Sequence, residues 1–138
     1  MNLEAELIMQ LHVQCQVDMD IKDDGSGYLK VIPIVGGTFE GEVKGTIVPG
    51  GADWNTTRNN NTSHVFAKYL LKTDDGEYIG IENEGKINNH ELLEIKTSPR
   101  FQVDSSSKYS WLNTGVYVAS LIPGDLEGQI EIFIYRMK

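Results

Sequence analysis

A carboxylate and an indole adjoin at the end of a glycine-rich corner. Residues 39–47 are predicted to form a strand that stops at Pro49-Gly50-Gly51, and Asp53 and Trp54 follow almost directly. A carboxylate in a pocket can serve as a general acid or base toward a bound organic molecule, while an indole supplies apolar contact. Asp53 is therefore a candidate catalytic residue, and Trp54 a candidate ligand-binding residue at a pocket rim.

A second stretch, residues 109–117, mixes aromatic and polar groups. Period-two spacing places Trp111, Asn113 and Tyr117 on one face, provided that residues 111–121 form a strand. Indole, amide and phenol together are typical of a lining for a partly aromatic ligand, and the amide or phenol could donate to developing oxyanion charge. The alternative left open is a polar outer face over a Leu/Val core.

Lys68 and Glu82 fall on the two strands of the clearest predicted hairpin, residues 65–83 around Asp74-Asp75-Gly76. Facing inward, Glu82 would be a general acid or base and Lys68 an electrostatic stabiliser. Facing outward, they would be an exposed cross-strand ion pair of small energetic value. The sequence leaves both orientations open.

Metal and nucleotide chemistry are not supported by the spacing of ligand-type residues. His12, His64 and His90 are isolated, and the single cysteine, Cys15, has no partner for a metal pair or a disulfide. The double glycines are followed by no phosphate-binding motif. We therefore predict no metal site and no cofactor, with Cys15 in the core.

The elements that must position these residues are strands. Odd positions from 3 to 17 are all apolar, which predicts a long half-buried strand. Aspartates at 18–25 indicate a hydrophilic turn, and the polar stretch 52–63 is predicted to be the longest loop. Further strands are expected at 28–35, 39–47, 65–73, 77–83, within 88–97, at 111–121 and at 129–137.

No helical periodicity is sustained anywhere in the 138 residues. Roughly eight short strands with glycine-bent interiors favour one all-β domain, residues 1–138, folded as a small antiparallel closed barrel. Closure removes the exposed edges that an open sheet of this size would present.

The charge balance bears on partners and on location. The formal net charge is -8, and the basic residues are scattered, so neither nucleic acid nor an anionic membrane surface is an expected partner. The N-terminus carries acidic residues instead of a signal peptide, which favours a cytoplasmic location.

Several motifs, in order along nearly the whole chain, resemble an uncharacterised bacterial family, domain of unknown function 3237. They are Gly37-Thr38-Phe39-Glu40-Gly41, the Gly-Gly-Ala-Asp-Trp corner, the Asp-Asp-Gly hairpin, Pro99-Arg100-Phe101, Trp111-Leu112-Asn113 and Tyr135-Arg136.

The resemblance implies a barrel similar to those of allene oxide cyclase and dirigent proteins. Such barrels hold a small organic molecule and steer its ring closure or coupling without a cofactor. The resemblance implies no particular reaction, because one fold hosts many functions. Members usually carry arginine where this chain has Lys68, so a bidentate grip on a ligand carboxylate would be weaker here.

Three functions follow as hypotheses. The first is a small-molecule-binding barrel lined by Trp54, Trp111, Asn113 and Tyr117. The second is a cofactor-free isomerase, cyclase or lyase in the same pocket, with Asp53 or Glu82 and Lys68 as catalytic candidates. The third is a homo-oligomeric scaffold whose barrel is filled. Under the first two, these residues are expected to surround one pocket, so whether the protein is an enzyme stays open.

Overall fold

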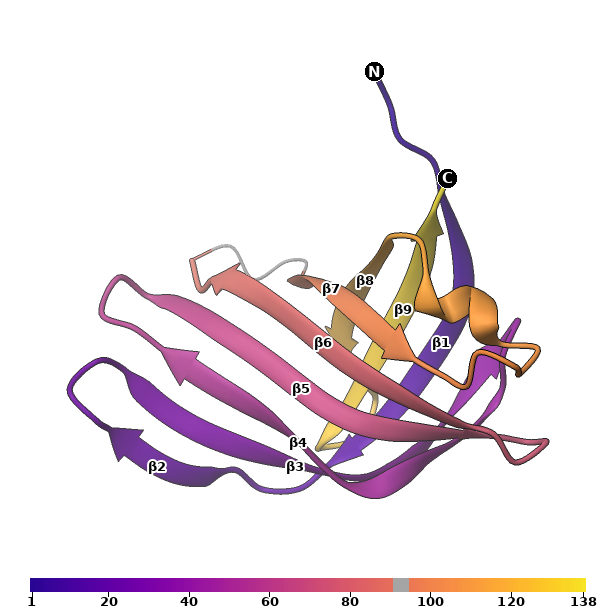
Figure 1. Cartoon of the computed structure of the whole chain (residues 1–138). Coiled ribbons are helices and arrows are strands. Elements are labelled where there is room, and N and C mark those ends of the chain that lie inside the picture. Colours follow the sequence, from indigo (N-terminus) through magenta and orange to yellow (C-terminus); the bar gives the residue numbers. More distant parts are fainter. Residues whose placement is uncertain (91–94) are drawn as a thin grey trace.

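The computed structural model describes residues 1–90 and 95–138, which form nine strands and one short 3-10 helix (Figure 1). The elements are β1 Ala5–Cys15, β2 Met19–Asp23, β3 Tyr28–Gly41, β4 Gly45–Thr57, β5 Thr62–Thr73, β6 Tyr78–Asn88, β7 Ile95–Gln102, η1 Ser110–Asn113, β8 Tyr117–Pro123 and β9 Gln129–Met137. In this described part of the chain, no helix is long and apolar enough to cross a membrane.

The sheet is antiparallel and closes on itself. Its order is β1-β9-β8-β7-β6-β5-β4-β3, and pairing of β1 with β3 completes an eight-stranded barrel, while β2 extends β3 outside the ring. The predicted closed all-β barrel is confirmed. So is the hairpin of β5 and β6, in which Lys72 pairs with Tyr78 across the turn.

Strand β1 follows the predicted alternation after one irregularity. Met9, Leu11 and Val13 are buried as expected, but the register against β9 shifts between Leu7 and Met9. Ile8 and Met9 are consequently both buried, whereas Leu7 is 49% exposed. Because of this bulge, Leu7, which the alternating pattern places in the core, lies outside it.

Glycine allows β3 to press closely against β1. Gly37 has φ +133°, and a Cβ built there would collide with the carbonyl oxygen of His12. The strand bends here, as the register shift between Ile34 and Thr38 records. Glycine at this position is therefore the physical cause of the bend.

Four predicted boundaries are wrong. Strand β3 continues past residue 35 to Gly41, so the strand predicted at 39–47 is divided between β3 and β4 by the turn at residues 42–44. Residues 18–25 contain the short strand β2, because the segment pairs with the start of β3. Strand β4 does not stop at Pro49: the chain bulges between Val48 and Ala52 and continues paired to Thr57, which leaves only a short turn where a long loop was expected. Residues 111–121 begin with η1, and β8 starts only at Tyr117. Within the predicted segment 88–97, positions 91–94 lie outside the described residues.

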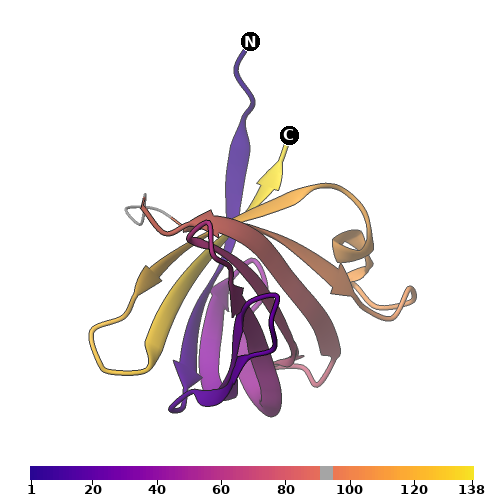
Figure 2. The ribbon, with the colours of Figure 1, turned by 90° about the vertical axis from the view of Figure 1, so that its left-hand side faces the viewer.

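The two ends of the barrel differ. Near η1 the interior is filled by large apolar side chains, and Leu112 of η1 itself is 2% exposed and belongs to the core. The opposite end, where β2 projects, faces the viewer in Figure 2. Strands β4, β5 and β6 extend to this end of the barrel. This end holds a cavity.

Candidate functional site

The cavity has a volume of about 340 Å³, within the range that accepts small organic molecules. All eight strands of the ring contribute to its wall, together with residues next to β2 and β9. The lining residues are Val13, Cys15, Gln16, Asp18, Ile32, Ile34, Asp53, Asn55, Val65, Ala67, Tyr69, Asn83, Ile87, Ile95, Thr97, Leu121, Gly128, Ile130 and Ile132.

Continuation of β4 past its bulge decides which side chains enter the cavity. Asp53 and Asn55 line it, while Trp54 between them is 49% exposed on the outer face. Side chains on a strand alternate between its two faces, so one residue of the pair predicted at the corner must point away from the other. Asp53 is thus inside the barrel, and Trp54 is outside.

The wall of the cavity has two chemically distinct sides. Strands β4, β5, β6 and β7, which are consecutive in the sheet, contribute the polar side chains of Asp53, Asn55, Tyr69, Asn83 and Thr97. Strands β8, β9, β1 and β3 contribute aliphatic side chains and the Cys15 thiol. The polar half, as we call the wall formed by β4 to β7, also includes aliphatic side chains, and Gln16 and Asp18 add polar groups just after β1. A molecule in the cavity therefore meets one wall richer in polar groups and one that is mostly apolar.

Four of these polar side chains have a buried oxygen without a hydrogen-bond partner among the described residues: Asn55 Oδ1, Tyr69 OH, Asn83 Oδ1 and Thr97 Oγ1. Tyr69, Asn83 and Thr97 are 4%, 3% and 5% exposed. A buried oxygen left unpaired costs about 1–3 kcal/mol, so native proteins keep few of them. In the described chain all four line this one cavity.

Asp53 is the ionisable group of the polar half. Its Oδ1 accepts a hydrogen bond from the backbone N–H of Phe66 at 3.1 Å. Burial raises the pKa of this carboxyl, and the hydrogen bond from Phe66 only partly opposes the rise. A carboxyl whose pKa is raised toward neutrality can exchange protons with a bound molecule.

Two further ionisable groups of the cavity are kept protonated. Burial raises the pKa of the Tyr69 phenol, and the nearby charge of Asp53 adds to the effect. Burial likewise raises the pKa of the Cys15 thiol. Tyr69 therefore faces the cavity as a neutral hydroxyl, and Cys15 as an unreactive thiol at neutral pH.

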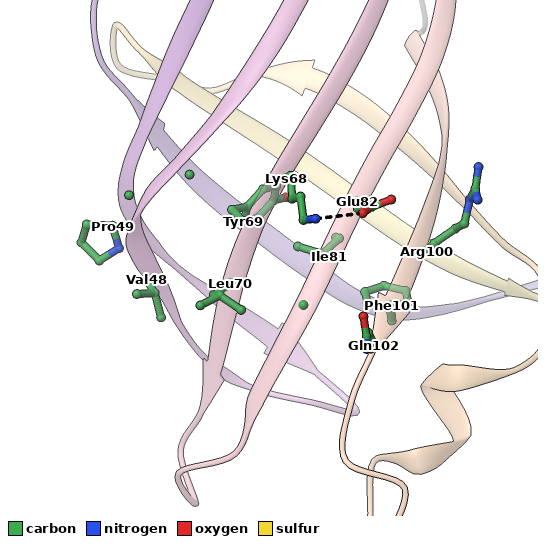
Figure 3. Close-up of a pocket in the computed structure, with 13 residues that line it drawn as sticks. Val48, Pro49, Lys68, Tyr69, Leu70, Ile81, Glu82, Arg100, Phe101 and Gln102 are labelled. Carbon is green, nitrogen blue, oxygen red and sulfur yellow. Dashed lines mark ion pairs between the residues drawn. The ribbon is translucent and has the colours of Figure 1, made fainter.

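Lys68 and Glu82 lie on the outside of the barrel. They are directly opposite each other on β5 and β6, and Nζ of Lys68 is 3.3 Å from Oε1 of Glu82 (Figure 3). The side chains are 71% and 41% exposed, the geometry of the cross-strand pair that the sequence left open. They border a shallow groove of about 460 Å³ with Pro49 and Arg100, on the opposite face of the sheet from Asp53.

Trp111, Asn113 and Tyr117 lie at the η1 end. The guanidinium of Arg136 lies 4.9 Å from the ring centroid of Trp111. Asn113 bonds both the N–H and the C=O of Val103 through its amide, at 2.9 and 3.0 Å. These contacts hold the loop that carries η1 against the end of β7.

The Tyr117 ring packs edge-on against Phe101, and its hydroxyl lies 3.0 and 2.9 Å from the carbonyl oxygens of Trp111 and Thr114. Its hydroxyl is thus used to fix the chain around η1. The six residues expected around one pocket are consequently in three places: Asp53 in the cavity, Lys68 and Glu82 on the outer face, and the other three near η1. There are two physical reasons. Residues 111–116 form no strand, so period-two spacing does not apply to them, and Lys68 and Glu82 alternate with inward-facing neighbours on β5 and β6.

Sequence reasoning missed four residues of the polar half: Asn55, Tyr69, Asn83 and Thr97. A signal was present in the hairpin, where Tyr69 and Asn83 alternate with buried Leu71 and Ile81 on one face. Polar residues at the inward-facing positions of an otherwise apolar strand indicate a polar site in the barrel interior. Asn55 is two residues beyond Asp53 and would have followed from a longer β4.

A histidine on the outer face lies between two carboxylates. His12 of β1 is 2.9 Å from Oε1 of Glu40 on β3, and its other ring nitrogen contacts Glu131 on β9. The hydrogen bond to Glu40 raises the pKa of His12, and Glu131 contributes to the rise, although burial opposes it. The ring of His12 therefore links three strands. No group of three His, Cys, Asp or Glu side chains in residues 1–90 and 95–138 is arranged to hold a metal ion.

Known proteins have this fold and related sequences. A UPF0311 protein of Bradyrhizobium diazoefficiens is 35% identical over 113 residues, which are 71% of this chain and 74% of that protein. The crystal structure of a conserved protein of unknown function from Rhodopseudomonas palustris matches with a TM-score of 0.88 at 26% identity, covering 100% of this chain and 99% of the other. A β-barrel-like protein from Acinetobacter baumannii matches with a TM-score of 0.86 at 29% identity, covering 100% and 98%.

The family described as Protein of unknown function (DUF3237) matches residues 3–137, nearly the entire chain. The motifs that suggested this family are therefore part of a likeness that extends from β1 to β9. The chain belongs to the DUF3237 family.

Proposed function

We propose that this protein binds a small organic molecule in the barrel cavity. The observation that carries the proposal is the gathering of four buried, unpartnered side-chain oxygens on the wall of one cavity. Apolar side chains at those positions would remove the energetic penalty of unpaired groups. A ligand that pairs with these oxygens supplies a reason for the polar residues.

The contrast between the two barrel ends supports binding over a purely structural role. A barrel of about eight strands can be filled by its own side chains or can hold one small ligand. The end near η1 is filled by residues such as Met9, Leu71 and Ile134, each no more than 1% exposed. The other end combines Ala67 with polar residues and keeps open space. A scaffold would be expected to fill both ends.

The proposal is tested through Cys15, the single cysteine, which lines the cavity. The rate of its reaction with N-ethylmaleimide is measured at pH 8.5 with and without naphthalene-2,7-diol, a rigid apolar probe with two hydroxyls. Bound probe should slow labelling by about tenfold or more, because it covers the thiol. An unchanged rate at millimolar probe contradicts the proposal.

Two neighbouring residues of β5 provide matched variants. Ala67→Phe places a ring in the cavity and should abolish protection by the probe, while Lys68→Phe places the same ring on the exposed outer face and should preserve it. Ala67→Leu serves as a smaller obstruction if the phenylalanine variant unfolds. Equal protection in the Ala67 and Lys68 variants would show that the probe binds elsewhere.

A second function, cofactor-free acid–base catalysis in the same cavity, is favoured by Asp53. Its raised pKa and its position in the polar half suit a general acid or base, and the neutral hydroxyl of Tyr69 could donate to developing negative charge. Asp53→Asn tests this candidate. Under catalysis, conversion of a ligand followed by NMR should fall about a hundredfold or more with little change in affinity, whereas pure binding gives no conversion in either protein.

The expectations from the sequence about partners, cellular location and oligomeric state belong to the proposal. We expect no salt-dependent binding of nucleic acid or anionic membranes, in keeping with the net charge of -8. A cytoplasmic location and a homo-oligomeric state remain predictions. Fractionation and light scattering address these two directly.

A further inference from the structure

Resting on the proposed function, we infer that the ligand is not an anion and that it carries at least two hydrogen-bond donors along one edge, with an apolar edge opposite. The juxtaposition behind this inference is a cavity with four unpartnered oxygens on the wall formed by β4 to β7, and with mostly aliphatic side chains on the wall formed by β8, β9, β1 and β3. The inference goes beyond binding, because it specifies the charge and polarity of the molecule.

The charges on the wall exclude an anion. Among the nineteen lining residues that the structure describes there is no Lys, Arg or His, whereas Asp18 and Asp53 both line the cavity. The two cations whose charges reach Asp53 do not line the cavity, and each pairs with a carboxylate: Lys30 lies 3.3 Å from Asp18, and His64 lies 2.6 Å from Glu84. A ligand carboxylate or phosphate would lose its water and gain no cation in return.

The unpartnered oxygens on the cavity wall favour a ligand that carries hydrogen-bond donors. The free atoms of Asn55 and Asn83 are amide oxygens, which can only accept, and Oδ1 of Asp53 already accepts a hydrogen bond from the N–H of Phe66. The hydroxyls of Tyr69 and Thr97 can adapt to either role. Hydroxyl or N–H groups on the ligand would therefore satisfy most of the polar half, whereas ether or ketone oxygens would leave the amide oxygens unpaired.

The spacing of the acceptors calls for two donors. Asp53 pairs with Ala67 across β4 and β5, and Ala67 pairs with Asn83 across β5 and β6. The two acceptors are thus two strands apart, about 10 Å between backbones, with only the methyl group of Ala67 between them. A ring system with a hydroxyl at each end of one edge fits this row, and its opposite edge would face Ile34 and Ile132.

Three compounds on one skeleton test the inference: naphthalene-2,7-diol, 2,7-dimethoxynaphthalene and naphthalene-2,7-dicarboxylate. Affinities are taken from calorimetry and from protection of Cys15. We expect the diol to bind at least tenfold more tightly than the dimethoxy compound, which keeps the shape but lacks donors, and the dicarboxylate to give no protection. Asn83→Leu should reduce the preference for the diol to about threefold, while Glu82→Gln, its outward-facing neighbour, should keep the preference.

The outcomes separate this inference from the function on which it rests. If the diol and the dimethoxy compound both protect Cys15 with affinities within threefold, the requirement for donors is wrong and the binding proposal stands. If the dicarboxylate binds as well as the diol, the exclusion of anions is wrong. If none of the three protects Cys15, the binding proposal fails, and the inference fails with it.

Discussion

Thr97→Val should stabilise the protein. Thr97 is 5% exposed, and its Oγ1 is one of the four unpartnered oxygens in the cavity wall. Valine keeps the shape and the branch that lies over Gly85, where an added Cβ would come within 2.8 Å of Thr97 Cγ2. Removing a buried, unpaired hydroxyl should recover about 1 kcal/mol of unfolding free energy, or about 3 °C in Tm. Urea unfolding followed by circular dichroism measures the change.

Thr73→Val is the matched control. Thr73 is 3% exposed and also lies on a strand, but its hydroxyl donates to Asp75 at 2.5 Å and accepts from the N–H of Glu77 at 2.9 Å. The same substitution there should cost about 2 kcal/mol, because it breaks a satisfied network. The two variants should therefore move the urea midpoint in opposite directions. A loss of stability in Thr97→Val comparable to that in Thr73→Val would refute the reasoning, since it would mean that the Thr97 hydroxyl is satisfied without a ligand.

Three further substitutions test the positions of residues outside the cavity. Asn113→Leu should cost about 1–2 kcal/mol of unfolding free energy through two lost backbone hydrogen bonds, and it should leave the affinity for naphthalene-2,7-diol unchanged; a tenfold loss of affinity would restore Asn113 to the site. The hydrogen bond to Glu40 raises the pKa of His12 above 6.5, so its stabilising contribution is complete below that pH and is lost as the pH rises through the folded-state value. Unfolding free energies between pH 6 and 9 should fall less steeply in His12→Gln, and identical slopes would contradict this. Gly37→Ala should lower the unfolding free energy by about 4 kcal/mol or prevent folding, because the added Cβ collides with β1. Gly50→Ala, at φ +121° in open space, should lower it by only about 2 kcal/mol through backbone strain. Comparable thermal stabilities of the two variants would disprove this difference.

The barrel could be predicted from the sequence because its signals are local. The alternation in β1 and the turn at residues 74–76 depend on side-chain type and on glycine at a fixed offset. These signals identify strands and a hairpin regardless of their surroundings. Strand β2 could not be predicted from a pattern of burial, because all five of its residues are exposed. The strand is stabilised by pairing with β3.

The candidate site was only partly predictable, because the direction of a side chain depends on the continuity of its strand. Asp53 was selected for its carboxylate next to Trp54, yet their opposite orientations follow only from the continuation of β4 through the bulge at Val48 to Ala52. Trp111 and Asn113 were assigned a shared face by a periodicity that requires a strand. Their actual 3-10 turn is held by contacts with Val103 and Arg136, which are distant in the sequence or reached through a loop.

The position of β1 between β3 and β9 has a consequence for synthesis on the ribosome. One edge of β1 is paired with β9, from Ala5 with Met137 to Gln14 with Gln129, and the N–H of Lys138 donates to the carbonyl oxygen of Glu4. Ring closure thus waits until β9 has left the exit tunnel, and until then the growing sheet has two open edges that can pair with other chains. A chain that terminates before residue 129 is therefore expected to form an open, aggregation-prone sheet instead of a smaller barrel.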